Sequence, residues 1–556
     1  MTTGSAHQTN KNFLSVNPPQ ATATATVNKR SSADLTIFGT EAKQLATVLN
    51  ERRAEPAPGQ HHHKKKNAFS GVFIPTCENM WGVLIFLRFY SAVGYSGVGF
   101  CILAIVMSFL VAFCTTSCLS AIASSGGLVS QGGPYYMISR SLGPYVGATV
   151  GLTKWLAITM LAVLESVGLV DALLLAAPGL NAITQFKRVV STGALALIGL
   201  TVWGGINFVS KLGVFFMVVV VLTIVFYYVG LIICPWSAKA HELQLSGLSS
   251  YNLSNNLGPD YGEGRNFGWT LSIMFPCFTG ILSGANRADI LKDPSENIKN
   301  GTFGAVCFSL VIYVSYVLLW GAVADRAFLK DEPTSTTGSS SSHRRLSGGG
   351  GSGNVVDALG WPSPLVVYIG IIISSLSQAL QCLIVAPKML QSIAADDFLP
   401  FLRPLAPLSK SKEPVRALAV TLGVGLVVIQ LQDLDTVAPL LTMCFLVCYA
   451  FMNISCLILT ILRSPTWRPK GIFKKRWRTF HILISSLGFV MCLVVMVVVS
   501  VYWALGVVAL ALGLYLLLSW KGEEAEWGSG LDGVRYNLAM SSLIGKYQVQ
   551  YDCKFP

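Results

Sequence analysis

The chain has 556 residues, of which 52% are hydrophobic and only 12% are charged, and its mean hydropathy is +0.57. This composition excludes a soluble globular protein and a disordered chain, and it predicts an all-α, multi-pass membrane protein. Most of the net charge of +13 comes from residues 1–70 and from Arg463 to Arg478, which the positive-inside rule places in the cytosol. Neither cluster carries a platform of stacking aromatic residues, so we expect no nucleic-acid partner.

Taken in chain order, residues 1–66 are polar and lack an apolar period, which predicts a disordered cytosolic tail. The transmembrane domain is expected over residues 67–522, and residues 523–556 form a short cytosolic tail. About 20 apolar residues are enough to cross a bilayer. Twelve segments meet this requirement, near residues 71–97, 99–124, 145–177, 188–206, 207–234, 267–291, 300–325, 363–390, 414–431, 435–462, 480–499 and 501–520.

Two of these segments are interrupted by glycine, one from Asn79 to Leu84 and the other from Phe275 to Gly284. Glycine weakens a helix and leaves backbone groups within reach. At membrane depth such groups are tolerated only where they line a cavity inside the protein, and paired interruptions indicate the binding site of a transporter. The alternative is a pair of kinked packing helices, because glycine is common in membrane spans.

The polar segment at 235–266 is expected to be external and carries the sequon Asn252-Leu253-Ser254, which predicts glycosylation of Asn252. Most of the thirteen cysteines lie in apolar segments and lack zinc spacing, so we expect buried free thiols and no metal site. The sequence contains no nucleophile motif, phosphate-binding glycine loop or metal cluster. We therefore expect neither an enzyme nor a cofactor.

Several motifs, in order along residues 70–535, resemble those of the cation-chloride cotransporter family, within the amino acid-polyamine-organocation superfamily. The motifs are Asn79-Met80-Trp81-Gly82-Val83 with Phe86-Leu87-Arg88, the segment from Gly132 to Pro144, Phe275-Pro276 with Thr279-Gly280-Ile281, Trp361-Pro362-Ser363-Pro364, Ala386-Pro387-Lys388, Trp467-Arg468-Pro469, and the segment from Glu526 to Leu531.

The resemblance implies a LeuT-like fold, in which five spans are repeated in inverted orientation, spans one and six are broken, and two spans are appended. The N-termini of half-helices suit chloride, because they carry partial positive charge and free N–H groups, and exposed carbonyl groups suit a dehydrated cation. By resemblance, the cation site comprises Asn79, Met80, Pro276 and Thr279. The chloride sites comprise Gly82, Val83 and Leu84 in one case, and Gly280, Ile281, Leu282 and Tyr449 in the other. Arg88 and Asp171 match a pair that closes the external mouth.

The sequence also departs from the family. Glu165 aligns with a tyrosine that links the cation and chloride sites, so we expect a carboxylate among the carbonyl groups of Asn79, Met80 and Pro276. Such a carboxylate would bind a cation through its charge, repel chloride from the site at Gly82, Val83 and Leu84, and make a proton a competitor for the cation. Two further unusual charges, Glu78 and Lys154, are expected to pair with Glu165 or to face water.

Other departures bear on the choice of ions. The sodium-dependent branch carries two adjacent serines in the eighth span, where this chain has Ser377-Gln378, a remnant of the sodium site. Trp81 resembles the sodium branch, whereas Trp361-Pro362-Ser363-Pro364 and Trp467-Arg468-Pro469 resemble the potassium-chloride branch. The family's large C-terminal domain is expected to be missing.

We therefore interpret the chain as a sodium-independent symporter of potassium, or a similar monovalent cation, and chloride. One alternative is a transporter of an amino acid, a polyamine or another cation, since Glu165 could pair with an amine. Another is a non-transporting membrane subunit that modulates a cotransporter. The expected location is the plasma membrane, with an endomembrane as the alternative. The expected partners are the lipid bilayer, potassium and chloride ions, and a second copy of the chain in a homodimer.

Overall fold

A computed structural model describes residues 66–124, 133–177, 185–204, 206–233, 247–262, 264–330, 360–397, 399–409, 413–432, 434–461 and 477–521, together with the single residues 539 and 542. The tails expected at 1–66 and 523–556 lie outside the described residues, apart from positions 66, 539 and 542. The motif Trp467-Arg468-Pro469 and the segment from Glu526 to Leu531 also lie outside them.

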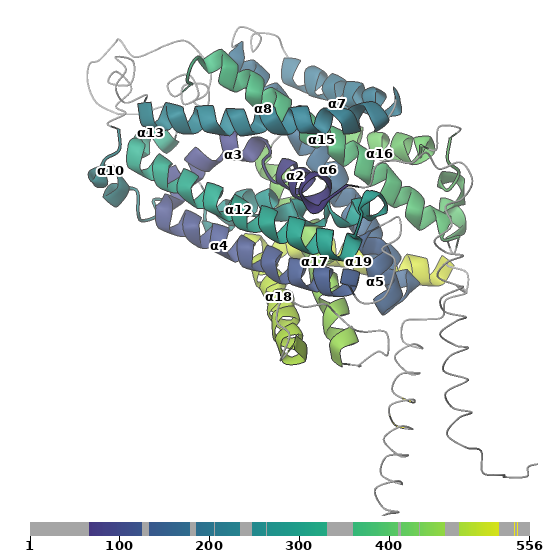
Figure 1. Ribbon diagram of the computed structural model, residues 1–556. Helices are drawn as coiled ribbons and strands as arrows, with labels where there is room; N and C mark the ends of the chain where they lie inside the picture. Colours follow the sequence, from purple (N-terminus) through teal and green to yellow (C-terminus); the bar gives the residue numbers. More distant parts are fainter. Residues whose placement is uncertain are drawn as a thin grey trace, which may run out of the picture. The chain divides into compact units, whose positions relative to one another are not determined.

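In the described part of the chain, the regular structure is helical apart from isolated bridge residues, of which Lys66 pairs with Leu291 (Figure 1). The elements that form the spans are η1 (Phe69–Phe73), α2 (Ile74–Glu78), α3 (Val83–Leu87), α4 (Phe89–Ser124), α6 (Pro144–Ala176), α7 (Phe186–Gly204), α8 (Ile206–Ile233), α11 (Phe267–Met274), η4 (Phe275–Leu282), η5 (Ala285–Ile290), α12 (Pro294–Val323), α15 (Pro364–Ala395), α16 (Val415–Val428), η7 (Ile429–Leu431), α17 (Leu434–Ile461), α18 (Trp477–Val499) and α19 (Val501–Lys521). Shorter helices between the spans are α5 (Pro134–Leu142), α10 (Ser250–Asn255), α13 (Arg326–Lys330) and η6 (Pro400–Leu405).

Eleven helices within the described ranges are long and apolar enough to cross a membrane. The segment predicted at 414–431 forms the shorter apolar helix Val415–Leu431. Each of the twelve predicted segments therefore corresponds to a helical element, which confirms an all-α membrane fold.

The first span is broken where the sequence predicts. Helix α2 ends at Glu78, and α3 begins at Val83 after an extended Gly82 (φ −91°, ψ −166°). Backbone hydrogen bonds from Arg88 N to Leu84 O and from Ala92 N to Arg88 O, both 2.9 Å, continue the second half-helix beyond α3. That half-helix ends at Gly97, whose positive φ of 71° turns the chain into the second span.

The interruption in the sixth span takes a different form. Between α11 and Ser283 the chain tightens into the 3₁₀-helix η4 instead of becoming extended. Pro276 lies in the first turn of this helix, and the Thr279 hydroxyl donates to the Pro276 carbonyl group at 2.7 Å. A 3₁₀ turn uses i→i+3 hydrogen bonds, so it leaves fewer backbone groups unpaired than an extended break does.

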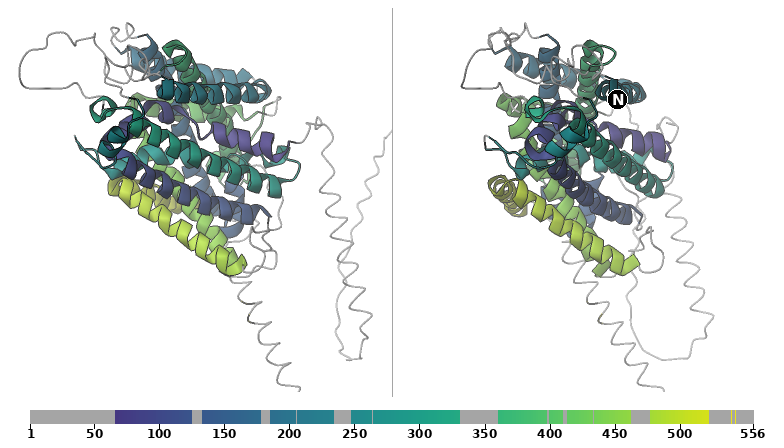
Figure 2. Two further views of the ribbon diagram at one scale, coloured as in Figure 1. Left: turned by 60° about the vertical axis from the view of Figure 1, so that its left-hand side comes forward. Right: turned by 90° about the vertical axis from the view of Figure 1, so that its left-hand side faces the viewer.

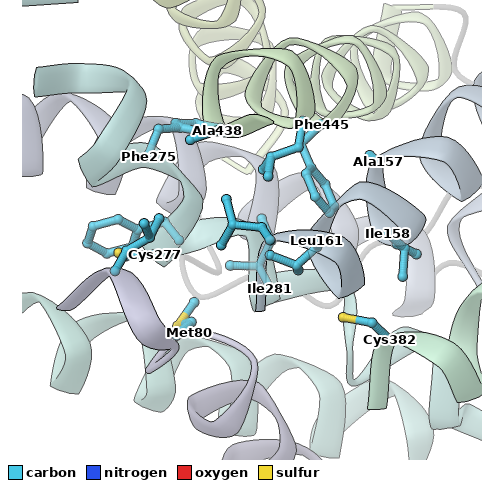
Figure 3. Packing of buried hydrophobic residues seen from close by; sticks show 14 of the residues in the cluster. Met80, Ala157, Ile158, Leu161, Phe275, Cys277, Ile281, Cys382, Ala438 and Phe445 are labelled. Atoms are coloured by element: carbon cyan, nitrogen blue, oxygen red, sulfur yellow. The ribbon is translucent and has the colours of Figure 1, made fainter. Parts of the chain in front are cut away.

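The two interruptions face each other in the interior of the helical assembly. Figure 3 shows Met80 of the first break, Cys277 and Ile281 of η4, and Leu161 of α6 pointing toward a common apolar region. Helices α4 and α12 lie side by side (Figure 1), and α18 packs along α4 (Figure 2). Burial of this apolar surface fixes the breaks against each other.

The segment before the sixth span packs against neighbouring helices through Asn256. Its side-chain amide donates to the carbonyl groups of Gly321 at 2.9 Å and Ala324 at 2.8 Å. Asn252 lies within α10 and is only 6% exposed. This burial argues against the expected glycosylation of Asn252, because a glycan on this side chain requires access to solvent.

The Gly97 turn provides a test of the fold. A Cβ atom there would collide with the Gly258 carbonyl group, and the positive φ also disfavours any L side chain. We expect Gly97→Ala to lower the free energy of unfolding by about 1–3 kcal/mol from backbone strain alone. The measurement is the thermal unfolding midpoint in detergent. Gly513→Ala in α19 is the matched control, because a Cβ atom there meets nothing within 4 Å. Equal midpoints for the two variants would contradict the assigned turn.

Candidate ion-binding site

The N–H group at the start of the second half-helix is held by a carboxylate. The two carboxylate oxygens of Glu165, on α6, accept from Val83 N at 3.3 and 3.2 Å. Glu165 is only 1% exposed. A Cβ atom at Gly82 would collide with Glu165 Oε1 and with Gln378 Oε1, so the glycine allows both oxygens to approach the backbone. Leu84 is the next residue of the half-helix and is buried.

A tyrosine connects the two breaks. The Tyr313 hydroxyl, on α12, lies 2.9 Å from the Met80 carbonyl oxygen and 3.0 Å from that of Cys277. Its single proton can serve either acceptor. Tyr313 is fully buried, so it holds the first break against η4 without access to water.

Helix α15 supplies donors to two other carbonyl groups of the first break. The Gln378 side-chain amide donates to Asn79 O at 3.1 Å, and the Ser374 hydroxyl donates to Trp81 O at 2.9 Å. Ser377, the other half of the predicted sodium-site remnant, is buried, and its hydroxyl has no hydrogen-bond partner among the described residues. Gln378 therefore contacts the first break through its side-chain nitrogen.

The residues predicted at the sixth span surround the same region. The Tyr449 hydroxyl, on α17, donates to the Thr279 carbonyl group at 2.9 Å, and Tyr449 is fully buried. Gly280 packs so closely that a Cβ atom would lie 2.9 Å from Thr76 O and 3.0 Å from Met80 Cγ. The neighbouring Ile281 and Leu282 are also buried. A larger side chain at position 280 would thus push the two breaks apart.

The predicted cation and chloride residues therefore come together, with one change. Glu165 was expected among the carbonyl groups of Asn79, Met80 and Pro276. Its hydrogen bonds are instead with Val83 N, a group assigned by resemblance to chloride. The physical reason is that a carboxylate accepts hydrogen bonds, and a half-helix N-terminus supplies a donor with partial positive charge.

Glu78 belongs to a second polar cluster below the first break. Its Oε2 accepts from the Gln381 side-chain nitrogen. The Gln381 oxygen in turn accepts from the Asn79 side-chain amide at 3.0 Å and from Arg287 at 3.1 Å. The expectation that Glu78 pairs with Glu165 or faces water is therefore wrong, since Glu78 is only 4% exposed and bonds to Gln381.

Lys154 is also buried, at 1% exposure. Its ammonium group lies 3.4 Å from the side-chain oxygen of Asn286, on η5. Lys154 precedes Glu165 by eleven residues, which places the two on one face of α6 but separates them by about 16 Å along its axis. The expected pairing of Lys154 with Glu165 is therefore excluded by distance.

The pair expected at the external mouth is also rearranged. Arg88 Nε lies 3.3 Å from the carboxylate of Asp435, in the first turn of α17, and Lys187 Nζ lies 2.7 Å from that of Asp171. The sequence identified both Arg88 and Asp171 as needing a partner, but assigned the wrong one. Arg88 lies at the junction of α3 and α4, where its side chain reaches the first turn of α17.

The family model described as amino acid permease matches residues 71–554. Among curated proteins, the chain is 32% identical over 559 residues to cation-chloride cotransporter 2 of Oryza sativa subsp. japonica, covering 92% of this chain and 53% of the relative. It is 32% identical to cation-chloride cotransporter 1 of the same species (87% of this chain, 50% of the relative) and 31% identical to cation-chloride cotransporter 1 of Arabidopsis thaliana (87% and 50%). The chain thus spans about half the length of these relatives.

The Tyr313 contact predicts a specific loss. Tyr313→Phe should leave the carbonyl groups of Met80 and Cys277 without their shared donor, at a cost of about 1–3 kcal/mol in the free energy of unfolding. It should also reduce ion transport, because the two breaks are no longer tied. Tyr228→Phe is the control, since that hydroxyl donates to Ile312 O at 3.0 Å, away from the breaks. A loss of transport of equal size in both variants would show that the Tyr313 hydroxyl has no specific role in transport.

The ion pair of Arg88 is tested by a double-mutant cycle on stability. The Arg88 and Asp435 side chains are 26% and 30% exposed, so we expect a coupling free energy of about 0.5–1 kcal/mol between Arg88→Ala and Asp435→Ala. Arg88→Ala with Asp171→Ala should be additive. The reverse result, with coupling confined to Arg88 and Asp171, would restore the pair expected from the sequence.

Proposed function

The chain belongs to the amino acid permease family and its curated relatives include cation-chloride cotransporters, and from this premise we propose that it is a secondary active symporter of a monovalent cation, potassium or a similar ion, and chloride. One observation carries the proposal: the two interrupted spans meet at buried backbone groups. These groups include carbonyl oxygens, which carry partial negative charge, and N–H groups, which carry partial positive charge. Carbonyl groups at Asn79, Met80 and Pro276, with the Thr279 hydroxyl, provide the cation ligands. N–H groups around Val83 and Gly280 provide chloride ligands.

Glu165, when ionised, adds a negative charge to this site. Since a carboxylate has several lone pairs, Glu165 can accept from Val83 N and coordinate a cation on its other side. The charge then serves as a built-in counter-ion for the cation, which loosens the requirement for chloride. A proton competes with the cation for the same group, so cation transport weakens at acidic pH.

Independence from sodium is supported by Gln378. The resemblance associates the sodium site with two adjacent serine hydroxyls, and here Gln378 replaces one of them. Its amide nitrogen lies 3.1 Å from Asn79 O and donates to it, so this position presents an N–H donor where the resemblance associates the sodium site with a hydroxyl oxygen. An N–H donor cannot coordinate a sodium ion.

The transport of an amine-bearing substrate is the second candidate function, and the buried carboxylate of Glu165 favours it. An amino acid or polyamine would place its ammonium group against that carboxylate. The third candidate is a subunit that does not transport ions itself. We further propose the plasma membrane as the location, cytosolic termini, and association as a homodimer.

Uptake of radioactive rubidium into proteoliposomes that contain only this protein tests the proposal. Rubidium stands in for potassium. We expect uptake to fall severalfold when gluconate replaces chloride, to be unchanged when N-methylglucamine replaces sodium, and to decline at acidic pH as protons compete for Glu165. Uptake that depends on an amine and not on chloride would favour the second candidate, and no uptake of either would favour the subunit.

Glu165→Tyr provides the matched variant, because it restores the family's phenol. We expect it to make rubidium uptake more strictly dependent on chloride and to flatten the pH response. If wild type and Glu165→Tyr share the same pH profile and chloride dependence, Glu165 has no part in ion binding. Unfolding midpoints of the two proteins establish that both are folded.

A further inference from the structure

A buried ammonium group lies on α6 without an acidic partner. Lys154 is only 1% exposed, and its hydrogen bond to Asn286 Oδ1, on η5, is long at 3.4 Å. An ammonium group has three donors, so this contact leaves most of its capacity unused. No carboxylate among the described residues forms an ion pair with Lys154. Because a buried charge without a counter-ion is costly, this position favours a negatively charged ligand.

The start of α5 reaches the same amide. A Cβ atom at Gly133, the residue before α5, would lie 2.7 Å from Asn286 Oδ1 and 3.1 Å from the Ala285 carbonyl oxygen. Gly133 also has a positive φ of 50°, so glycine is required on both counts. The Asn286 oxygen therefore contacts both the Lys154 ammonium group and the residue from which α5 begins.

The packing of α5 along α6 supports this placement. A Cβ atom at Gly147 of α6 would collide with Ser139 of α5, and one at Gly151 would collide with the ring of Tyr135. Four residues toward the start of α5 thus correspond to four residues toward the C-terminal end of α6. One further step along both helices brings the start of α5 level with Lys154.

Two positive groups therefore meet at this junction. Helix α5 has nine residues, and no described side chain caps its first turn. The N-terminus of a helix carries partial positive charge, which adds to the charge of Lys154. Asn286 and Ala285 contribute only neutral oxygens there, and the Cys448 thiol of α17, which also lies within electrostatic range of Lys154, is a weak donor. The two positive groups repel each other unless an anion lies between them.

We infer that Lys154, Asn286 and the start of α5 form a binding site for a small inorganic anion, such as chloride or bromide. Lys154 supplies the charge, and the first turn of α5 supplies partial positive charge. The Asn286 amide can turn to present its nitrogen, so it donates to a bound anion and accepts from Lys154 when the anion leaves. The burial of Lys154 restricts the ligand to a small ion. None of these residues belongs to the proposed chloride sites at Val83 and Gly280.

Thermal unfolding of the purified protein in lipid nanodiscs tests the site, with chloride replacing gluconate at constant ionic strength. Lys154→Met removes the charge and keeps an unbranched apolar chain. In gluconate we expect this variant to unfold at a higher temperature than wild type, because an uncompensated buried charge is gone. Added chloride should close this gap, since it stabilises wild type through the additional site. Chloride bound elsewhere contributes equally to both proteins.

Lys292→Met is the matched control, because it makes the same substitution at an exposed lysine just after η5. Its midpoint should follow that of wild type at every chloride concentration. Lys154→Arg keeps the charge and should keep the full response to chloride. A chloride response in Lys154→Met equal to that of wild type, or a constant loss of stability in both salts, would overturn the inference. Sulfate that closes the gap as well as chloride does would contradict the assignment to a small ion.

Anomalous diffraction from crystals of the wild-type protein in bromide locates the ion without any variant. We expect a bromide peak in contact with Lys154 Nζ. Peaks confined to Val83 and Gly280 would overturn the inference. The site is independent of the proposed symport: a bromide peak at Lys154 in a protein without chloride-coupled rubidium uptake would support the site while symport fails. Coupled uptake with no peak at Lys154 would support symport and contradict the site.

Discussion

The backbone at the break of the first span must find hydrogen-bond partners inside the protein, because lipid offers none. Three helices supply them: α6 through Glu165, α12 through Tyr313, and α15 through Gln378 and Ser374. These contacts decide where the broken span lies in the assembly. These contacts also constrain ion binding. An ion that binds to this backbone must share its polar groups with the side chains that already bond to them, or displace those side chains.

The two breaks contribute differently to the site. At the first break only Gly82 is extended, because the N–H groups of residues 79–81 still donate to Pro75 O and Cys77 O, whereas 275–282 keep a 3₁₀ hydrogen-bond pattern and approach the first break through Gly280. Side chains from other helices bond to the carbonyl groups of residues 79–81 and to the N–H group of Val83. The sixth span acts mainly by close packing, which transmits any movement of one break to the other.

The sequence predicted the features that depend on local chemistry. Hydrophobic length located the spans, and glycine located the breaks at Gly82 and Gly280, because a missing Cβ atom is a property of the residue itself. It also identified Glu165 as unusual. The partners of buried charges could not be predicted, since they depend on how helices far apart in the chain pack. Tyr313, Ser374 and Gln381 were missed for this reason, because a polar residue in an apolar span looks the same in sequence whether it bonds to its own helix or to a break.

The buried charges share one arrangement that bears on transport. Gln381 links Glu78 to Arg287, Asn286 contacts Lys154, and Gln378 lies beside Glu165, so a side-chain amide adjoins each charge. A direct buried ion pair would neutralise both partners and fix them in place. An amide carries both a donor and an acceptor but no charge, so it can satisfy either protonation state of a neighbour. Such an amide therefore satisfies hydrogen bonds without neutralising the adjacent charge, which is the property that the proposed ion site requires.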